Sequence, residues 1–171
     1  MEALKSKIRH VPDFPKAGIL FYDVTTLLRD PEGFRLAIDS LSTPYRGRQI
    51  DIVVGIESRG FILGAAVADR LGAGFVPVRK LGKLPSTTVR ATYDLEYGSD
   101  SLEVHKDAVE PGQRVLVVDD LLATGGTARA TVGLVKQLGG RVESVAFLIE
   151  LTDLNGRKQL QGENILAVLQ Y

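Results

Sequence analysis

The segment Val115-Leu-Val-Val-Asp-Asp-Leu-Leu-Ala-Thr-Gly-Gly-Thr127 predicts both the fold class and the place of a ligand site. Its four apolar residues, 115–118, are typical of a strand that is buried on both faces. Two carboxylates follow at the expected end of this strand, and a turn of small residues then opens a helix. In open α/β sheets, ligands bind beyond the carboxyl ends of the strands. We therefore expect a binding site at this turn.

The turn Ala123-Thr-Gly-Gly-Thr127 has the chemistry of a phosphate site. The N–H groups and the positive dipole end of a helix N-terminus attract an anion, and glycines let the backbone approach it closely. The preceding Asp119 and Asp120 suit sugar hydroxyls, as hydrogen-bond acceptors, or a Mg²⁺ ion. This pattern predicts a sugar that carries a phosphate. The alternative interpretation is a strand–turn–helix unit with two exposed aspartates and no ligand.

Strands and helices alternate along most of the chain. Strands are predicted at Ile50–Ile56, Gly74–Val78, Arg114–Val118 and Val142–Leu151, and helices at Pro31–Leu41, Phe61–Leu71 and Thr127–Leu138. This alternation indicates an α/β fold with a mainly parallel sheet and helices on both faces. Before the first long helix we expect a short helix, a proline-broken loop at Val11–Gly18 and a short strand. A single domain over residues 1–171 is predicted.

Residues 79–110 interrupt the alternation, because they show no clean helical period. Tyr93–Tyr97 and Ser101–His105 are predicted as two strands around a turn at Gly98-Ser-Asp100, a hairpin with little to bury. A long excursion from a compact domain is often a lid or a binding loop. An ordinary exposed hairpin is the alternative.

Composition excludes several classes of protein. Across the 171 residues, 21 Lys and Arg balance 21 Asp and Glu, which argues against a dedicated nucleic-acid binder but allows a local basic pocket. The absence of Cys excludes disulfides and thiol nucleophiles, and two His are too few for a multi-histidine metal centre. The charged N-terminus is unlike a signal peptide, and no apolar run approaches the roughly 20 residues that span a bilayer. We expect a cytoplasmic protein without a membrane or nucleic-acid partner.

The segment 118–127 resembles the phosphoribosyl-diphosphate motif of the type I phosphoribosyltransferases. Four further segments are similar to the same family in the right order: Val11–Asp23, Glu57–Phe61, Arg79–Pro85 and Tyr93–Gly98. The resemblance therefore covers nearly the whole chain. It implies a type I phosphoribosyltransferase-like fold with a protruding lid hairpin, a short N-terminal hood region and a homodimer.

The same resemblance implies a reaction. The phosphoribosyl group of 5-phosphoribosyl 1-diphosphate passes to N9 of adenine, giving AMP and diphosphate in purine salvage, with Mg²⁺ as cofactor. It also implies the residues that bind the donor. They are Ser58, Arg59, Arg79, Lys80, Lys83, Tyr93, Asp119, Asp120, Ala123, Thr124, Gly125, Gly126 and Thr127. Asp119 and Asp120 would meet the metal mostly indirectly, through the substrate.

Position along the chain supports part of this assignment. Arg59 lies just past the Ile50–Ile56 strand, and its guanidinium suits bidentate contact with a diphosphate. Arg79, Lys80 and Lys83 cluster after the next strand, although a solvated basic loop is the plain alternative. The resemblance implies that one such residue crosses the dimer interface, and Arg79 is our choice.

Catalysis and base binding rest on the resemblance alone. Arg59 and Glu96 would be catalytic, with Glu96 in the place of the family's candidate acid or base near N7 and N9 of the purine. Leu20, Phe21 and Tyr22 would bind adenine, with the Phe21 ring packed on the base. Without the resemblance, Glu96 would be one more surface residue and Phe21 a core aromatic. A closing lid would keep water from an oxocarbenium-like transition state.

Two alternative functions remain open at this stage. A transferase for hypoxanthine, guanine or xanthine would usually carry Asp at the position of Ala123. A non-enzymatic regulator that senses phosphoribosyl diphosphate should carry a basic face or a DNA-binding extension, and this chain has no net positive charge. Both observations favour the adenine enzyme.

Overall fold

A seven-stranded sheet forms the centre of the computed structural model, which describes residues 2–95 and 98–171. Its strand order is β5-β6-β4-β3-β7-β8-β9. The strands are β3 (Ile52–Ile56), β4 (Gly74–Lys80), β5 (Thr88–Leu95), β6 (Gly98–His105), β7 (Arg114–Leu122), β8 (Arg141–Glu150) and β9 (Ile165–Gln170). Neighbours from β4 to β9 pair in parallel, whereas β6 pairs antiparallel both with β4 and with β5. The predicted mainly parallel sheet is thus confirmed.

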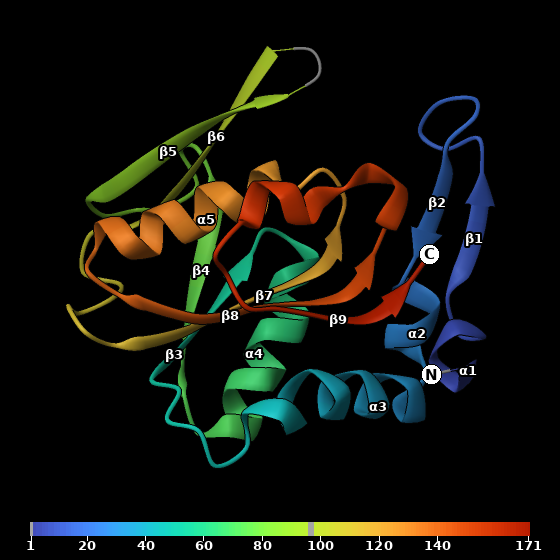
Figure 1. Cartoon of the computed structure of the whole chain (residues 1–171), viewed down its shortest axis with the longest axis horizontal. Helices are drawn as coiled ribbons and strands as arrows, with labels where there is room; N and C mark the ends of the chain where they lie inside the picture. Colours follow the sequence, from blue (N-terminus) through green and yellow to red (C-terminus); the bar gives the residue numbers. More distant parts are fainter. Residues whose placement is uncertain (1, 96–97) are drawn as a thin grey trace.

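Helices cover both faces of this sheet (Figure 1). On one face lie α3 (Pro31–Ser42) and α4 (Arg59–Leu71), and on the other lies α5 (Gly126–Gln137). Short 3₁₀ turns are η1 (Thr43–Tyr45), η2 (Thr152–Leu154) and η3 (Gly156–Leu160). Apolar side chains from the sheet meet those of the helices in two buried clusters. These two buried clusters hold the sheet and its helices together, and they thereby fix the loops that follow the strands.

Local sequence chemistry accounts for two of the helix ends. Asp30 caps α3, because its Oδ2 accepts a hydrogen bond of 2.9 Å from the Gly33 amide, and Pro31 occupies the first turn. Gly72 ends α4 in the left-handed region, with φ of 66°. Local chemistry therefore fixes where both helices begin and end.

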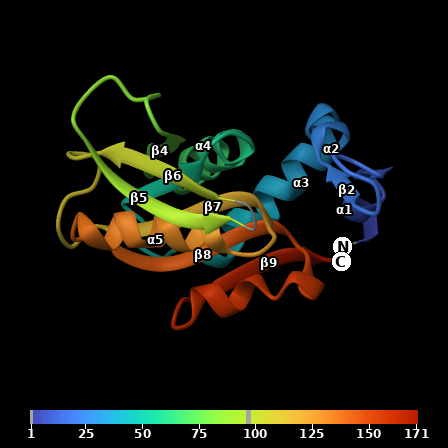
Figure 2. The same ribbon diagram turned by 90° about the horizontal axis from the view of Figure 1, so that it is seen from above.

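An N-terminal hood stands at one end of the sheet. It contains α1 (Glu2–Lys5), β1 (Arg9–Pro12), β2 (Leu20–Asp23) and α2 (Thr25–Arg29), and β1 pairs antiparallel with β2. Seen from above, the hood and the β5–β6 hairpin lie at opposite ends of the molecule (Figure 2). The strand at 9–12 was not predicted, since Pro12 argued for a loop. Proline is tolerated here because Pro12 is the last residue of a strand in a two-stranded ribbon, where its missing N–H group breaks no ladder of a central strand.

Two boundary predictions are wrong. Strand β7 continues to Leu122, so that Asp119 and Asp120 lie inside it rather than after it, because β8 runs on to Glu150 and extends the parallel ladder. Residues 98–100 belong to β6 and pair with residues 93–95, instead of forming the turn.

The hairpin also buries more than its sequence indicated. Leu102 and Val104 are almost fully buried, since β4 pairs with β6 and α5 packs over the hairpin. No helix among the described residues is long and apolar enough to cross a membrane.

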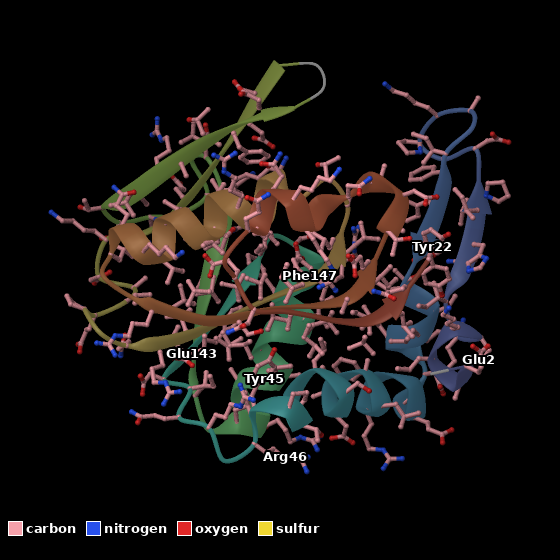
Figure 3. All side chains as sticks on the ribbon, viewed as in Figure 1. Glu2, Tyr22, Tyr45, Arg46, Glu143 and Phe147 are labelled. Atoms are coloured by element: carbon pink, nitrogen blue, oxygen red, sulfur yellow. The ribbon has the colours of Figure 1, made fainter. Side chains whose placement is uncertain are left out.

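We predict that Phe147→Ala lowers the free energy of unfolding by about 3–5 kcal/mol, because the side chain fills the centre of the core. Phe147 has no solvent exposure and lies in the middle of the molecule (Figure 3). Urea unfolding measures the loss. Phe14→Ala is the matched control, since Phe14 is 50% exposed. Equal losses for the two variants would contradict the assigned core.

Candidate active site

A cavity of about 470 Å³ lies at the carboxyl ends of β3, β4 and β7, a size suited to a small ligand. The loops that follow these strands supply its walls. The lining residues are Glu57, Ser58, Arg59, Lys80, Asp119, Asp120, Leu121, Leu122, Ala123, Thr124, Gly125, Thr127 and Ala128. Most residues predicted to bind the donor are thus brought together from three separate stretches of sequence.

The turn 123–127, which we call the phosphate turn, leads from β7 into α5. Gly125 is the N-cap residue and has φ of 89°, a conformation that favours glycine. It offers no side chain to cap the helix, so the first N–H groups of α5 keep their hydrogen-bonding capacity for a ligand. Thr124 and Thr127 line the cavity beside these amides. The turn can therefore hold an anion, as its sequence predicts.

Asp119 and Asp120, the acidic pair, are held by hydrogen bonds and by an ion pair with Arg59. Asp120 is 5% exposed, and the Arg59 side chain donates a hydrogen bond to it within an ion pair. Asp119 accepts a 2.9 Å hydrogen bond from the Asp120 amide. Burial, and then the negative charge of Asp120, raise the pKa of Asp119 well above its ordinary value. Both carboxyls lie on the cavity wall, where they can meet sugar hydroxyls.

Arg79 and Lys80 are the last two residues of β4, and Lys83 follows the strand. Of these three cations, only Lys80 lines this cavity among the described residues. The Lys80 ammonium lies 2.6 Å from a carboxylate oxygen of Asp100, which belongs to the hairpin. Arg79 instead donates to Glu57, at 3.2 Å, and to the Lys83 carbonyl oxygen, also at 3.2 Å. Lys83 is exposed. The sequence thus identified the cluster but not which member faces the cavity.

A second cavity of about 440 Å³ lies under the hood. Its lining residues are Val11, Phe14, Phe21, Tyr22, Asp23, Val24, Thr25 and Arg59. The Phe21 ring meets Phe14 edge-on at 5.1 Å between centroids, and the Arg59 guanidinium lies 5.8 Å from the Phe21 centroid. Phe21 therefore faces a cavity rather than the core. Leu20 is 43% exposed and is not part of this lining.

Arg59 lines both cavities and so marks the place where they meet. Tyr22 is backed by aromatic rings, with the Tyr171 centroid at 4.2 Å and the His10 centroid at 5.1 Å, and it points from the hood toward the sheet (Figure 3). A planar apolar ligand beside Phe21 would lie next to the charged cavity. This geometry suits a reaction between a flat base and a phosphorylated sugar.

The hairpin reaches the phosphate turn through Tyr93. Its hydroxyl accepts a 3.4 Å hydrogen bond from Thr127 and donates one of 3.4 Å to Asp100. Gly126 lies directly under the Tyr93 ring, since a Cβ there would be 3.2 Å from it. Tyr93, Gly126 and Thr127 also line a third cavity of about 790 Å³, which lies between β5 and α5. Glu96 lies outside the described residues, so its role stays a prediction.

Sequence reasoning missed Glu57, Asp100 and Asp23. Glu57 accepts hydrogen bonds from Arg79 and from the Lys80 amide, and thereby orients the end of β4. Its position at the end of β3, next to Ser58, was the available signal. For Asp100 no local signal exists, because its partner Lys80 is 20 residues away.

Comparisons with known proteins agree with this geometry. Residues 23–163 match the family model described as phosphoribosyl transferase domain. The chain is 62% identical over 170 residues to adenine phosphoribosyltransferase of Acidobacterium capsulatum, covering 99% of this chain and 94% of that protein.

Solved structures are similar over the same length. The crystal structure of adenine phosphoribosyltransferase from Thermoanaerobacter pseudethanolicus is 54% identical, with a TM-score of 0.96 and 99% of both chains covered. The enzyme from Saccharomyces cerevisiae, complexed with an imino-altritol bisphosphate and adenine, is 42% identical, with a TM-score of 0.93 and coverage of 98% and 97%. The predicted fold class is confirmed.

Stability should depend on pH through Asp23 in the wall of the hood cavity. Hydrogen bonds from Thr25, and then from Arg9, lower the pKa of Asp23 to about 2. The ionised form is thus favoured in the folded chain, and its contribution is present above the ordinary pKa and is lost as pH falls through the range from 3.8 to about 2. We expect Asp23→Asn to cost about 1–2 kcal/mol at neutral pH and less with each step below pH 4.

Urea unfolding of wild type and variant between pH 7 and pH 3 measures this difference. Asp107→Asn is the control, because Asp107 is exposed. A constant difference between wild type and Asp23→Asn over the whole range would contradict the assignment.

Proposed function

Because this chain belongs to the phosphoribosyltransferase family, we propose that the cavity at the ends of β3, β4 and β7 holds 5-phosphoribosyl 1-diphosphate and the hood cavity holds adenine. The chain transfers the phosphoribosyl group to adenine and forms AMP and diphosphate, the reaction of a pentosyltransferase in purine salvage. The observation that carries the site assignment is the position of Arg59, whose side chain lines both cavities. The bond to be formed joins the contents of these two cavities.

The donor would lie with its 5′-phosphate on the phosphate turn. The N–H groups at the start of α5 and the hydroxyls of Thr124 and Thr127 are the donors for this phosphate. Asp119 and Asp120 would accept hydrogen bonds from the ribose hydroxyls, since both carboxyls lie at the end of β7 beside the turn. The sugar is then fixed at both ends, which orients its anomeric carbon.

The diphosphate would bind Arg59 and Lys80, with Ser58 beside them. Arg59 is paired with the Asp120 carboxylate and Lys80 with the Asp100 carboxylate. When 5-phosphoribosyl 1-diphosphate binds, the guanidinium and the ammonium group would donate their hydrogen bonds to phosphate oxygens instead. Stabilisation of the negative charge that grows on the leaving diphosphate is the main catalytic contribution of these residues.

Mg²⁺ is the proposed cofactor. Among the described residues no group of three or more potential ligand side chains surrounds one point, which fits an ion bound chiefly by substrate oxygens. Asp119 and Asp120 are the carboxylates that would assist in holding it. When bound, Mg²⁺ supplies positive charge that neutralises the diphosphate.

In the hood cavity, adenine would stack on Phe21 next to Tyr22. The N9 lone pair forms a bond to the anomeric carbon as the bond from that carbon to the diphosphate oxygen breaks. The purine must lose one proton in this step, and we assign that transfer to Glu96. Residues 79–110 are proposed as the lid that excludes water, because Tyr93 of the hairpin already contacts Thr127 of the phosphate turn.

A homodimer and a cytoplasmic location complete the proposal. Ile62 and Leu81 are 47% and 49% exposed, and Arg79, the neighbour of Lys80, contacts the ring of Phe61. Large exposed apolar side chains next to a cation suit a subunit interface, across which Arg79 would reach the partner's diphosphate.

The base preference tests the proposed function. We expect AMP formation from adenine, Mg²⁺ and 5-phosphoribosyl 1-diphosphate, with kcat/KM for hypoxanthine, guanine and xanthine lower by about 10⁴-fold, since a site built to pair with one purine edge leaves its polar groups unpaired with another. Ribose 5-phosphate, which has no leaving group, is the control donor. Equal turnover of a 6-oxopurine would overturn the base assignment. A folded protein that binds the donor and turns over no base would be a regulator.

Replacing Arg59 tests the diphosphate assignment. Arg59→Gln should raise the dissociation constant of 5-phosphoribosyl 1-diphosphate by about 10- to 100-fold, because a charge-assisted bidentate contact is lost. The affinity for AMP, which carries no diphosphate, should fall less. Titration calorimetry measures both constants, and Arg35→Gln on the exposed side of α3 is the control. Equal losses for both ligands would refute the assignment.

A further inference from the structure

The 3₁₀ segment η3 packs directly against the phosphate turn. It appears as an orange-red coil beside the start of α5 (Figure 1). A Cβ on Gly125 would overlap the Gly156 carbonyl oxygen, and a Cβ on Gly156 would overlap the Ala123 carbonyl oxygen. A Cβ on Gly156 would also come within 2.8 Å of the Leu122 side chain. Turn and segment are thus in backbone contact, with no space between them for side chains.

An ion pair between a buried carboxylate and a partly exposed arginine fixes η3 to the sheet. Glu150, at the end of β8, is 4% exposed and accepts two hydrogen bonds from Arg157, of 2.6 Å and 2.8 Å. Gln170 of β9 donates a third, of 3.0 Å, to the same carboxylate. Bidentate geometry with a third donor satisfies a charge that would otherwise be costly to bury. Arg157 follows Gly156 directly, so this pair sets the position of the glycine.

Two further bonds close the frame around the turn. The Leu151 amide donates to the Leu122 carbonyl oxygen at 2.9 Å, which ties the strand ends on either side. Arg129, in the first turn of α5, donates to the Gln159 side chain of η3 at 2.9 Å. The phosphate turn is therefore held at its start, at its middle and just after its end.

We propose that η3 is a clamp that sets the affinity of the phosphate turn for a sugar phosphate, with Glu150, Gly156 and Arg157 as its positioning residues. The inference rests on the proposed function, in which the turn binds the 5′-phosphate. Amide donors bind an anion well only when their directions are fixed before it arrives. Gly125 lacks a side-chain cap, so the turn depends on contacts from outside, and η3 supplies them.

Titration calorimetry with two probes tests the clamp. Ribose 5-phosphate reports on the phosphate turn, and Mg²⁺-diphosphate reports on the site at Arg59 and Lys80. Gly156→Ala displaces the turn, and Arg157→Met unties η3 from Glu150. Each variant should raise the dissociation constant of ribose 5-phosphate by about tenfold or more. The constant for diphosphate should stay within about twofold of wild type, since that site lies on other elements.

Matched variants separate positioning from general loosening. Gly133→Ala adds a methyl group in α5 where a Cβ meets nothing within 4 Å, and Lys158→Met removes an exposed cation next to Arg157; both should bind like wild type. Arg157→Lys keeps the charge without the bidentate geometry and should bind ribose 5-phosphate with intermediate affinity. It also serves as the milder change if Arg157→Met does not fold.

Three results would overturn the clamp. The first is unchanged affinity for ribose 5-phosphate in folded Gly156→Ala and Arg157→Met. The second is an equal loss for both probes. The third is a wild-type protein that binds diphosphate but not ribose 5-phosphate, which would remove the phosphate turn from the proposed function as well and is visible before any variant is made.

Discussion

The close contact between the first turn of α4 and the end of β7 is the constraint on which the site depends. A Cβ on Gly60 would lie 2.8 Å from the Asp119 carboxylate and 3.1 Å from the Val118 carbonyl oxygen, and one on Gly55 would lie 2.7 Å from the Gly60 carbonyl oxygen. Only glycine at both positions lets helix and sheet approach so closely. As a result the Arg59 side chain starts beside the acidic pair and reaches Asp120.

Charge balance within the cavity follows from this packing. Burial and the neighbouring charge of Asp120 raise the pKa of Asp119, and Arg59 supplies the compensating positive charge. Lys80 is likewise paired with Asp100 on the hairpin. The zero net charge of the chain is thus compatible with an anion site, because the cations around the cavity have carboxylate partners that a phosphorylated ligand can replace.

The hood and the hairpin frame the sheet edge from opposite ends, and each brings part of the site to it (Figure 2). The hood contributes the aromatic wall around Phe21, and the hairpin contributes Tyr93 and the partner of Lys80. The sheet between them contributes the charged groups. Parallel strands make this possible, since their carboxyl ends all open at one edge.

Much of this could be predicted from the sequence, because the relevant signals are local. Apolar runs indicate the parallel strands, and Asp30 and Gly72 indicate helix ends. Residues 119–127 contain both the acidic pair and the phosphate turn. Each of these features depends on side chains within a few residues of one another, so spacing alone is informative. The family resemblance added the reaction, which the comparisons bear out.

Tertiary structure decided what depends on partners far apart in the chain. Strand β7 extends to Leu122 because it pairs with the neighbouring strand β8. Lys80, and not Lys83, faces the cavity because of the path that the chain takes at the end of β4. The pairing of Glu150 with Arg157 beside the turn is equally invisible in the sequence, since nothing local shows that η3 returns to Ala123. Sequence thus determined which chemical groups the site contains, whereas packing determined which of them meet, because contacts across elements follow from geometry and not from spacing along the chain.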